Sequence, residues 1–200
     1  MNDSSMDYLE TAKRQVAESV RVKTALLGDE AALQTLARVA ALLVETYRKG
    51  NKSLWAGNGG SAADAQHMAA ELVNKFNRDR RGLPALALTV DSSALTAIGN
   101  DYGFQKLFSR QIEALGKEGD VFVGISTSGN SANLAEALEK CREKGIASVA
   151  LVGANPCKMD AYDYVIHVPS TETPRIQECH TLLGHILCGA VEECLFGDTQ

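Results

Sequence analysis

The sequence predicts an α/β fold, in which a parallel five-stranded sheet is flanked by helices, preceded by a helical hairpin and followed by a long C-terminal helix. Three observations point to this fold. Residues 3–50 show helical but no strand periodicity, short apolar runs alternate with helical patterns from Ser53 onward, and the last segment is again helical. Apolar runs that alternate with helices are what a parallel sheet covered on both faces requires.

The N-terminal hairpin is predicted over residues 1–50, in two helices. The first extends from about Asp3 to Leu27. The second has Asp29 as a candidate N-cap and Gly50 as its end. Apolar side chains recur along it at three- and four-residue steps, which gives it one apolar face. They are Leu33, Leu36, Ala37, Ala40, Leu43, Val44 and Tyr47.

Five short apolar runs supply the predicted strands. Each has four to seven residues rich in β-branched and aliphatic side chains, and helical patterns separate them. The chain then closes with a helix from about Pro174 to Phe196, which has its proline in the first turn. The five runs cover residues 53–56, 85–90, 120–126, 147–153 and 164–168.

The length of 200 residues, 45% of them hydrophobic, indicates one domain over residues 1–200, with the hairpin at 1–50 and the α/β core at 51–200. A domain of this size buries about 70% of the surface that its extended chain would expose, so it needs no disulfide bonds to be stable. The five cysteines form no C-x-x-C pair and are expected to be reduced. The helix surface left over in this arrangement suggests burial against another subunit.

Charge and hydropathy exclude several classes of function. A formal net charge of −5, with both signs scattered along the chain, offers no basic face for nucleic acid. The first residues are polar and acidic, unlike a secretory signal, and no run of about 18 apolar residues predicts a membrane helix. We therefore expect a cytoplasmic protein that binds neither nucleic acid nor membrane.

Two loops have the composition of phosphate-binding turns. The first predicted strand ends in G-N-G-G-S at residues 57–61, and the third ends in S-T-S-G-N-S at residues 126–131. The following helices are expected to begin near Ala62 and Ala132. Glycines let backbone N–H groups approach an anion, the helix N-terminus adds partial positive charge, and each hydroxyl can donate a hydrogen bond. Both loops follow the carboxyl ends of strands, where ligands of parallel sheets bind, so we expect them to face one crevice.

Either loop alone could equally be a tight turn without a ligand. Neither fits a nucleotide-binding motif, because the first lacks the lysine of a Walker A loop and does not have the G-x-G-x-x-G spacing of dinucleotide sites. Together the two loops favour a small phosphate monoester over ATP or NAD.

Two helices offer acid, base and metal-ligating side chains. His67 and Glu71 lie four residues apart and share one face of the helix after the first loop. Gln177 and His185, on the terminal helix, are separated by a little over two turns and so point in similar directions. Two nitrogens, a carboxylate and an amide oxygen could form a zinc-type site. A histidine on an apolar helix is more often a hydrogen-bonded core residue, as we expect for His180, so spacing alone leaves both interpretations open.

The order of five motifs, over nearly the whole chain, resembles the phosphoheptose isomerases of the sugar isomerase (SIS) domain superfamily. The motifs are G-N-G-G-S, D-A-Q-H-M-A-A-E, G-N-D-Y-G-F, G-I-S-T-S-G-N-S-A-N and T-P-R-I-Q-E-C-H-T-L-L-G-H-I-L-C. The resemblance implies an SIS-type parallel five-stranded sheet with an N-terminal helical hairpin. It also implies a homotetramer with active sites at the subunit interfaces.

The resemblance further implies roles for individual residues, none of which is replaced in this sequence. It implies one zinc ion per subunit, bound by His67, Glu71, Gln177 and His185, with Glu71 and His185 as the acid/base pair. Because this sequence keeps the acid/base pair, the resemblance favours an enzyme over the relatives that serve as replication-initiation partners, which lack parts of this set. The implied substrate-binding positions, together with Ser61 of the first loop, are Asn58, Gly59, Gly60, Asn100, Asp101, Ser126, Thr127, Ser128, Ser131 and Gln177.

The implied reaction converts sedoheptulose 7-phosphate, a seven-carbon sugar phosphate, into D-glycero-D-manno-heptose 7-phosphate by metal-assisted proton transfer through an enediol or enediolate. A non-catalytic SIS-domain regulator, or a replication-initiator-binding protein, is the alternative from another class. An isomerase for a six-carbon sugar phosphate is a second alternative, since the sequences of the loops do not indicate how many carbons the sugar has. Glu71 and His185 can exchange the roles of acid and base, and iron, nickel or cobalt suit the same ligands as zinc.

Overall fold

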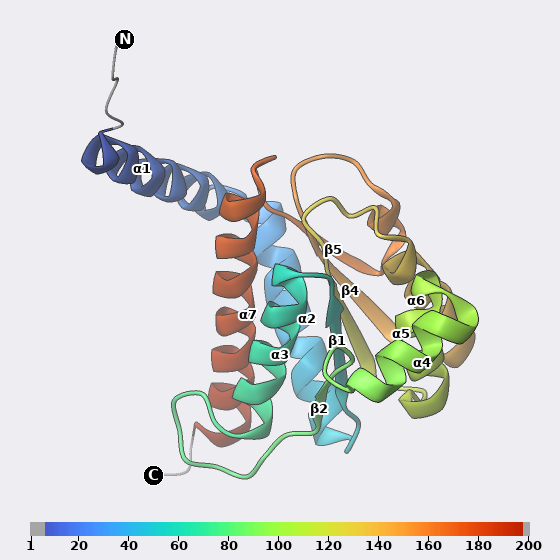
Figure 1. The fold of residues 1–200 in the computed structure, drawn as a ribbon. Coiled ribbons are helices and arrows are strands. Elements are labelled where there is room, and N and C mark those ends of the chain that lie inside the picture. The colour runs from blue at the N-terminus through green and yellow to red at the C-terminus, as the bar shows by residue number, and fades with distance from the viewer. Residues whose placement is uncertain (1–6, 198–200) are drawn as a thin grey trace.

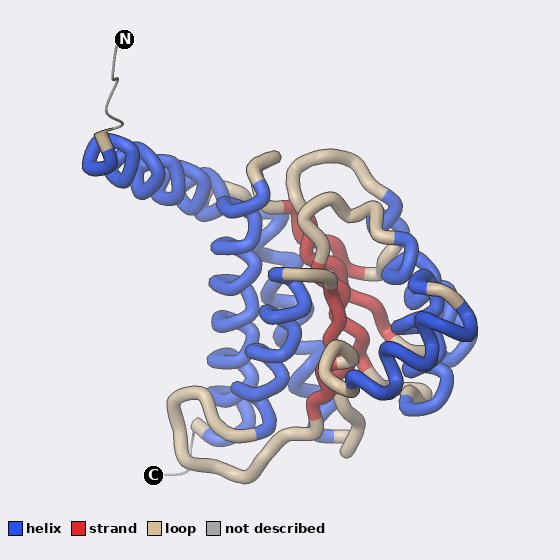
Figure 2. The backbone as a smooth tube through the Cα atoms, viewed as in Figure 1, coloured by secondary structure: helices blue, strands red, loops and turns tan. Residues whose placement is uncertain are grey.

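The computed structural model describes residues 7–197 and confirms the predicted α/β fold around a five-stranded parallel sheet (Figure 1). The strands lie in the order β2-β1-β3-β4-β5. Helices cover both faces, which gives three layers (Figure 2). The strands are β1 Ser53–Gly57, β2 Ala85–Ala87, β3 Val121–Ile125, β4 Ala147–Val152 and β5 Tyr164–His167.

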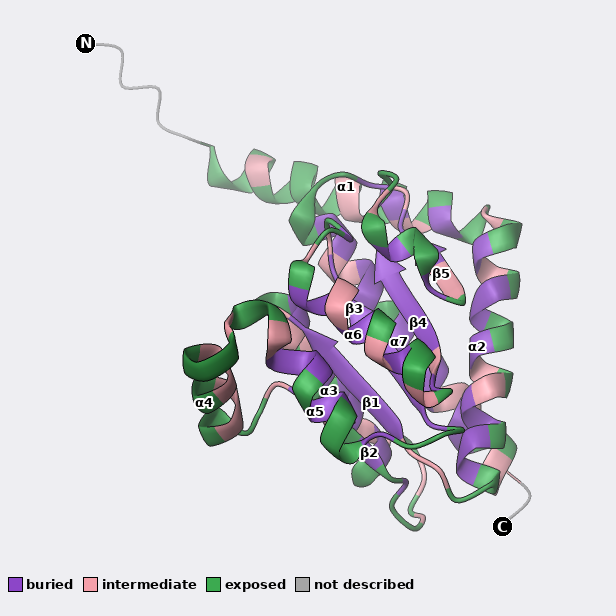
Figure 3. Cartoon of the chain, turned by 90° about the vertical axis from the view of Figure 1, so that its right-hand side faces the viewer, coloured by how far each residue is buried: buried purple, intermediate pink, exposed green. Residues whose placement is uncertain are grey.

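Side chains of the central strands alternate between two apolar cores, as the two-residue period of a strand dictates. On β1, Trp55 enters the core beneath α2, α3 and α7, whereas Leu54 enters the core beneath α5 and α6. Val123 and Phe122 divide in the same way on β3, and these strands are buried on both faces (Figure 3). The helices of the two layers are α2 Glu30–Arg48, α3 Gly60–Val73 and α7 Thr173–Phe196 on one face, and α4 Ser92–Tyr102, α5 Leu107–Leu115 and α6 Ala132–Lys144 on the other.

The two predicted N-terminal helices are confirmed. The first, α1, covers Tyr8–Leu27 and begins at Asp7, whose carboxylate accepts hydrogen bonds from two N–H groups of the first turn. The predicted start at Asp3 lies outside the described residues. Asp29 caps α2 as predicted, by accepting a hydrogen bond from the N–H of Ala32. The hairpin is open, because α1 leads away from the rest of the chain (Figure 1).

Two predictions about the elements were wrong, one in the length of a strand and one in the structure of a connection. The second strand pairs only over Ala85–Ala87 rather than 85–90, because the chain then turns into α4, which Asp91 caps. The connection between β4 and β5 contains a short 3-10 helix, Lys158–Ala161, where a helical pattern was expected. This connection covers only residues 153–163, which is at the lower limit of the length that a helical crossover needs.

The described residues contain no helix that combines the length and the apolar character required to cross a membrane. All five cysteines are free, and Cys141, Cys179 and Cys188 are buried. The reduced state of these thiols stays a prediction.

The topology brings the two glycine- and serine-rich loops together. Strands β1 and β3 are neighbours, aligned from the pair Ser53 and Val121 to the pair Gly57 and Ile125. The chain leaves β1 into α3 on one face of the sheet and leaves β3 into α6 on the other. Ligands of parallel sheets bind where two neighbouring connections part in this way.

Candidate active site

Two asparagines join the loops that follow β1 and β3. The amide of Asn58 donates to Asn133 at 3.0 Å, and the amide of Asn133 donates back to Asn58 at 2.8 Å. Asn133, in the first turn of α6, is only 1% exposed. Paired amides satisfy each other's donors and acceptors in the interior, so this contact fixes one loop relative to the other.

The loop after β3 is a hydroxyl-rich turn at the start of α6. The Ser126 hydroxyl accepts a hydrogen bond from the N–H of Gly129 at 3.0 Å and lies 3.4 Å from the Ser131 hydroxyl. Gly129 has a φ of 63°, a conformation that favours glycine. Thr127 and Ser128 line a cavity of about 200 Å³, together with Asn130, Ala154, Asn155, Ser170, Thr171, Thr173 and Ile176. This turn therefore presents hydroxyl groups and a helix N-terminus to a small polar cavity.

The loop after β1 meets α7. Asn58 and Gly59 line a second cavity of about 190 Å³, whereas Ser61 is buried. A Cβ atom on Gly60 would collide with the side-chain amide of Gln177. The predicted substrate ligand Gln177 therefore lies directly against the first loop.

Helices α3 and α7 run side by side from this contact onward. One turn further along, the Thr181 hydroxyl donates to the Asp64 carboxylate at 2.8 Å. Close approach is possible because Gly184 of α7 lies against the Met68 side chain, where a Cβ would collide. Burial raises the pKa of Asp64, although the hydrogen bond from Thr181 opposes the shift. Side chains on the facing surfaces of the two helices thus meet at successive turns, along a line that we call the α3–α7 seam.

Three of the four predicted metal ligands come together in this seam. The Nε2 atom of His67 lies 3.0 Å from Oε1 of Glu71 and 3.3 Å from Nε2 of His185. The ligating atoms of the three side chains all lie within 4.8 Å of one another. Two imidazole nitrogens and one carboxylate oxygen are zinc-type ligands, and a catalytic zinc site needs three protein ligands with one open position. The His67 side chain is 43% exposed, so a small ligand can reach the group.

Other predicted site residues lie outside this trio of His67, Glu71 and His185. Gln177 is eight residues before His185, or about 12 Å along α7, so its role as a fourth ligand stays a prediction. Asn100 and Asp101 are exposed at the end of α4, where the Asn100 amide donates to the Asp101 carboxylate at 2.7 Å. Their contact with substrate also stays a prediction.

Sequence reasoning missed three groups of residues around the site. Asn133 was part of a motif but had no role, although it holds Asn58. Ser170, Thr171 and Thr173 precede or open α7, and only the fold brings them beside the β3 loop. Arg80 and Glu192, at the far end of the seam, pair across 112 residues of sequence, which no local pattern could indicate.

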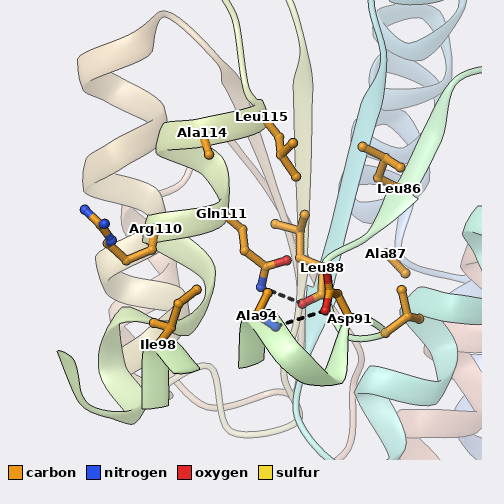
Figure 4. A pocket seen from close by; sticks show the side chains of 11 residues that line it. Leu86, Ala87, Leu88, Asp91, Ala94, Ile98, Arg110, Gln111, Ala114 and Leu115 are labelled. Carbon is orange, nitrogen blue, oxygen red and sulfur yellow. Dashed lines mark hydrogen bonds between the residues drawn. The ribbon is translucent and has the colours of Figure 1, made fainter. Parts of the chain in front are cut away.

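A larger cavity lies away from this chemistry. It has about 500 Å³, opens between β2, α4 and α5, and is lined mainly by apolar side chains such as Leu86 and Ile98 (Figure 4). The Gln111 amide at its wall already donates to the carbonyl of Leu88 at 2.9 Å. An apolar lining of this kind suits a sugar phosphate poorly, because the phosphate would lose its hydration without replacement.

Comparisons with known proteins point to one family. Residues 16–153 match the SIS domain. A phosphoheptose isomerase from Aneurinibacillus thermoaerophilus is 58% identical over 191 residues, which cover 95% of each chain. Phosphoheptose isomerase 2 from Campylobacter jejuni is 54% identical over 186 residues, or 92% of each chain. The solved structure of a phosphoheptose isomerase from Neisseria gonorrhoeae, 44% identical, matches with a TM-score of 0.87 over 93% of this chain and 99% of that one.

Proposed function

Because the chain belongs to the phosphoheptose isomerases of the SIS-domain family, and is thus an aldose–ketose phosphosugar isomerase, we propose its substrate and its mechanism. The substrate is sedoheptulose 7-phosphate and the product D-glycero-D-manno-heptose 7-phosphate. The observation that carries the proposal is the meeting of His67, Glu71 and His185 on the helix pair whose start adjoins the first loop.

The reaction needs one group that removes a proton from carbon and one that serves the oxygens. In the isomerisation a proton leaves C1 of the ketose and one is added at C2, while another passes between the two oxygens. The Glu71 carboxylate can accept the C1 proton and return it at C2, and the His185 imidazole can move the proton between the oxygens. The two side chains can also exchange these roles, because both can donate and accept protons.

Three side chains would hold the metal, namely His67, Glu71 and His185, with Gln177 as the further ligand that the family implies. When bound, zinc supplies Lewis acidity that polarises the carbonyl and stabilises the negative charge of the enediolate. The three residues would thereby also be fixed relative to one another.

The phosphate end of the substrate would lie in the hydroxyl-rich turns. Ser126, Thr127, Ser128 and Ser131 offer hydroxyl donors at the start of α6, which suits a phosphate monoester. Binding at that end supplies free energy that positions the reacting carbons at the other end.

The proposal includes a homotetramer in the cytoplasm. Helix α1 exposes Leu9, Val16, Val20 and Leu27, which are spaced by seven, four and seven residues. Such spacing puts all four on one side of a helix, as an apolar stripe. A stripe of this kind on a helix that leads away from its own chain supports burial against other subunits.

A coupled assay tests the proposed function. Purified protein is offered five-, six- and seven-carbon ketose phosphates, with and without a chelator, after its metal content and its mass in solution have been measured. We expect turnover of the seven-carbon substrate, loss of turnover with the chelator, and recovery when zinc is added. Preference for a six-carbon substrate would replace the assigned substrate, and full activity in metal-free protein would remove the metal from the mechanism.

A further inference from the structure

A buried ion pair closes the far end of the α3–α7 seam, beyond the three site residues. The Nε atom of Arg80 donates to Oε1 of Glu192 at 3.1 Å, and both side chains are 2% exposed. Buried ion pairs cost desolvation free energy, and apolar replacements of similar volume often leave a protein as stable or more stable. Stability alone therefore does not account for a buried pair at this place.

Arg80 caps the end of the helix that carries Glu71. Its guanidinium donates to the carbonyl of Glu71 at 2.8 Å, to that of Leu72 at 2.7 Å and to that of Asn74 at 3.0 Å. The last carbonyls of a helix have no partner within the helix and need one from elsewhere. Glu71 lies in the last turn of α3, so Arg80 fixes the part of the backbone from which the Glu71 carboxylate extends.

Glu192 holds the loop that follows α3. Its carboxylate accepts hydrogen bonds from the N–H groups of Phe76 at 3.0 Å, Asn77 at 2.7 Å and Arg78 at 3.0 Å, in addition to the bond from Arg80. Burial would raise the pKa of Glu192, but these N–H groups outweigh it and hold the pKa below its ordinary value. The carboxylate is therefore ionised, and four donors point at it.

The same loop brings an aromatic ring onto His185. The ring centroids of Phe76 and His185 are 5.4 Å apart. Gly189, one turn after His185 on α7, lies beside the Phe76 ring, because a Cβ atom placed there would be in ordinary van der Waals contact with the ring, at 3.4 Å. Through its bond to the Phe76 N–H, Glu192 thus fixes the packing of the His185 imidazole.

We propose that Arg80 and Glu192 are positioning residues of the isomerase site, which hold Glu71 and His185 in the arrangement needed for metal binding and proton transfer. The catalytic part of this inference rests on the proposed function of Glu71 and His185. Partners that orient metal ligands commonly change metal affinity or activity by about 10- to 100-fold when they are replaced.

The test compares two neighbouring glutamates. In Glu192→Gln the shape is kept, but the amide accepts at one end only and turns its N–H₂ group toward two donors. Glu193→Gln is the matched control, because Glu193 pairs with Arg78 at 2.6 Å on the surface and its side chain is 66% exposed. We expect Glu192→Gln to lower kcat and zinc affinity by at least about tenfold, with KM changed less than about twofold. The control Glu193→Gln should match wild type in kcat, zinc affinity and KM.

Two readouts do not depend on isomerase activity. Zinc affinity is measured by competition with a chromophoric chelator, and the imidazoles of the four histidines are observed by NMR. Weaker zinc binding and shifted His67 and His185 signals in Glu192→Gln support the positioning role even if the wild type turns over no heptose phosphate, a result that would remove only the proposed function. A folded Glu192→Gln protein with wild-type kcat, zinc affinity and signals would overturn the inference, as would a raised KM with unchanged kcat.

A second variant covers the case in which Glu192→Gln does not fold. Phe76→Leu keeps the N–H that bonds to Glu192 and removes only the ring that packs on His185. We expect shifted His185 signals and a fall in kcat of a few fold, with KM unchanged. Wild-type signals and wild-type kcat in Phe76→Leu would contradict the proposed path from Glu192 to His185.

Discussion

The loops at the ends of β1 and β3 and the seam between α3 and α7 are built in different ways. Each loop uses consecutive residues, 57–61 or 126–131, and the turn after β3 presents hydroxyls that it arranges itself, as in the hydrogen bond from the Gly129 N–H to Ser126. The seam uses side chains from distant segments, such as His67 and His185, which are 118 positions apart. The loops therefore depend on local conformation and the seam on helix packing. Substitutions in the loops should therefore weaken substrate binding, whereas substitutions in the seam should abolish proton transfer.

The largest effect is expected from the seam itself. Glu71→Gln removes the carboxylate that can take up a proton, and His185→Ala removes the imidazole. Each should lower kcat by about 10²- to 10⁴-fold, the range typical of acid/base groups, and so abolish practical turnover. The measurement is a steady-state assay with sedoheptulose 7-phosphate on metal-analysed protein.

A surface glutamate provides the control for this pair of variants. Glu45 is paired with Arg48 in an exposed ion pair on α2, at 2.8 Å, so Glu45→Gln should leave turnover unchanged. Near wild-type rates in Glu71→Gln or His185→Ala would show that the seam does not carry the proton transfer. The assignment of substrate binding to the loops and of proton transfer to the seam would then be wrong.

A smaller effect, on stability, comes from the buried side of α7. His180 is 1% exposed, and burial lowers its pKa from 6.5 to about 4. The unfolded chain therefore binds a proton at this position between pH 6.5 and 4 that the folded protein does not bind, so stability falls as the pH falls through this range. The contribution is on the order of 3 kcal/mol across the window. In His180→Phe the dependence of the unfolding free energy on pH should flatten there, as measured by urea denaturation. An unchanged slope would show that His180 does not titrate in this way.

The sequence predicted those parts of the molecule whose physical cause is local. Apolar runs marked all five strands, and the two loops were found from their glycines and hydroxyls. The second strand was drawn too long because Leu88 still donates its N–H to Trp55, at 2.8 Å, after the ladder has ended, and an apolar run does not show where the chain leaves the sheet.

The seam could be predicted only in part. The four-residue spacing of His67 and Glu71 placed them on one face, but their convergence with His185 rested on the family resemblance. Asn133 and Glu192 escaped prediction because their partners lie 75 and 112 residues away, and an isolated polar residue in a helix is usually solvated. Their burial and their partners become visible only when the helices are packed.

The smallest effect is expected at the loops. Ser128 is exposed beside the cavity of the β3 loop, so Ser128→Ala should remove one hydrogen bond to the phosphate and raise KM by roughly tenfold, with kcat changed less than about twofold. Ser126→Ala should raise KM further, because the Ser126 hydroxyl also holds the N–H of Gly129. Ser93→Ala, on the exposed face of α4, is the control and should leave both constants unchanged. The phosphate is remote from the reacting carbons, so its hydrogen bonds are the same before and during proton transfer and appear in KM. A fall in kcat as large as the rise in KM would show instead that the loops also orient the reacting carbons, and binding and chemistry could then not be assigned to separate regions.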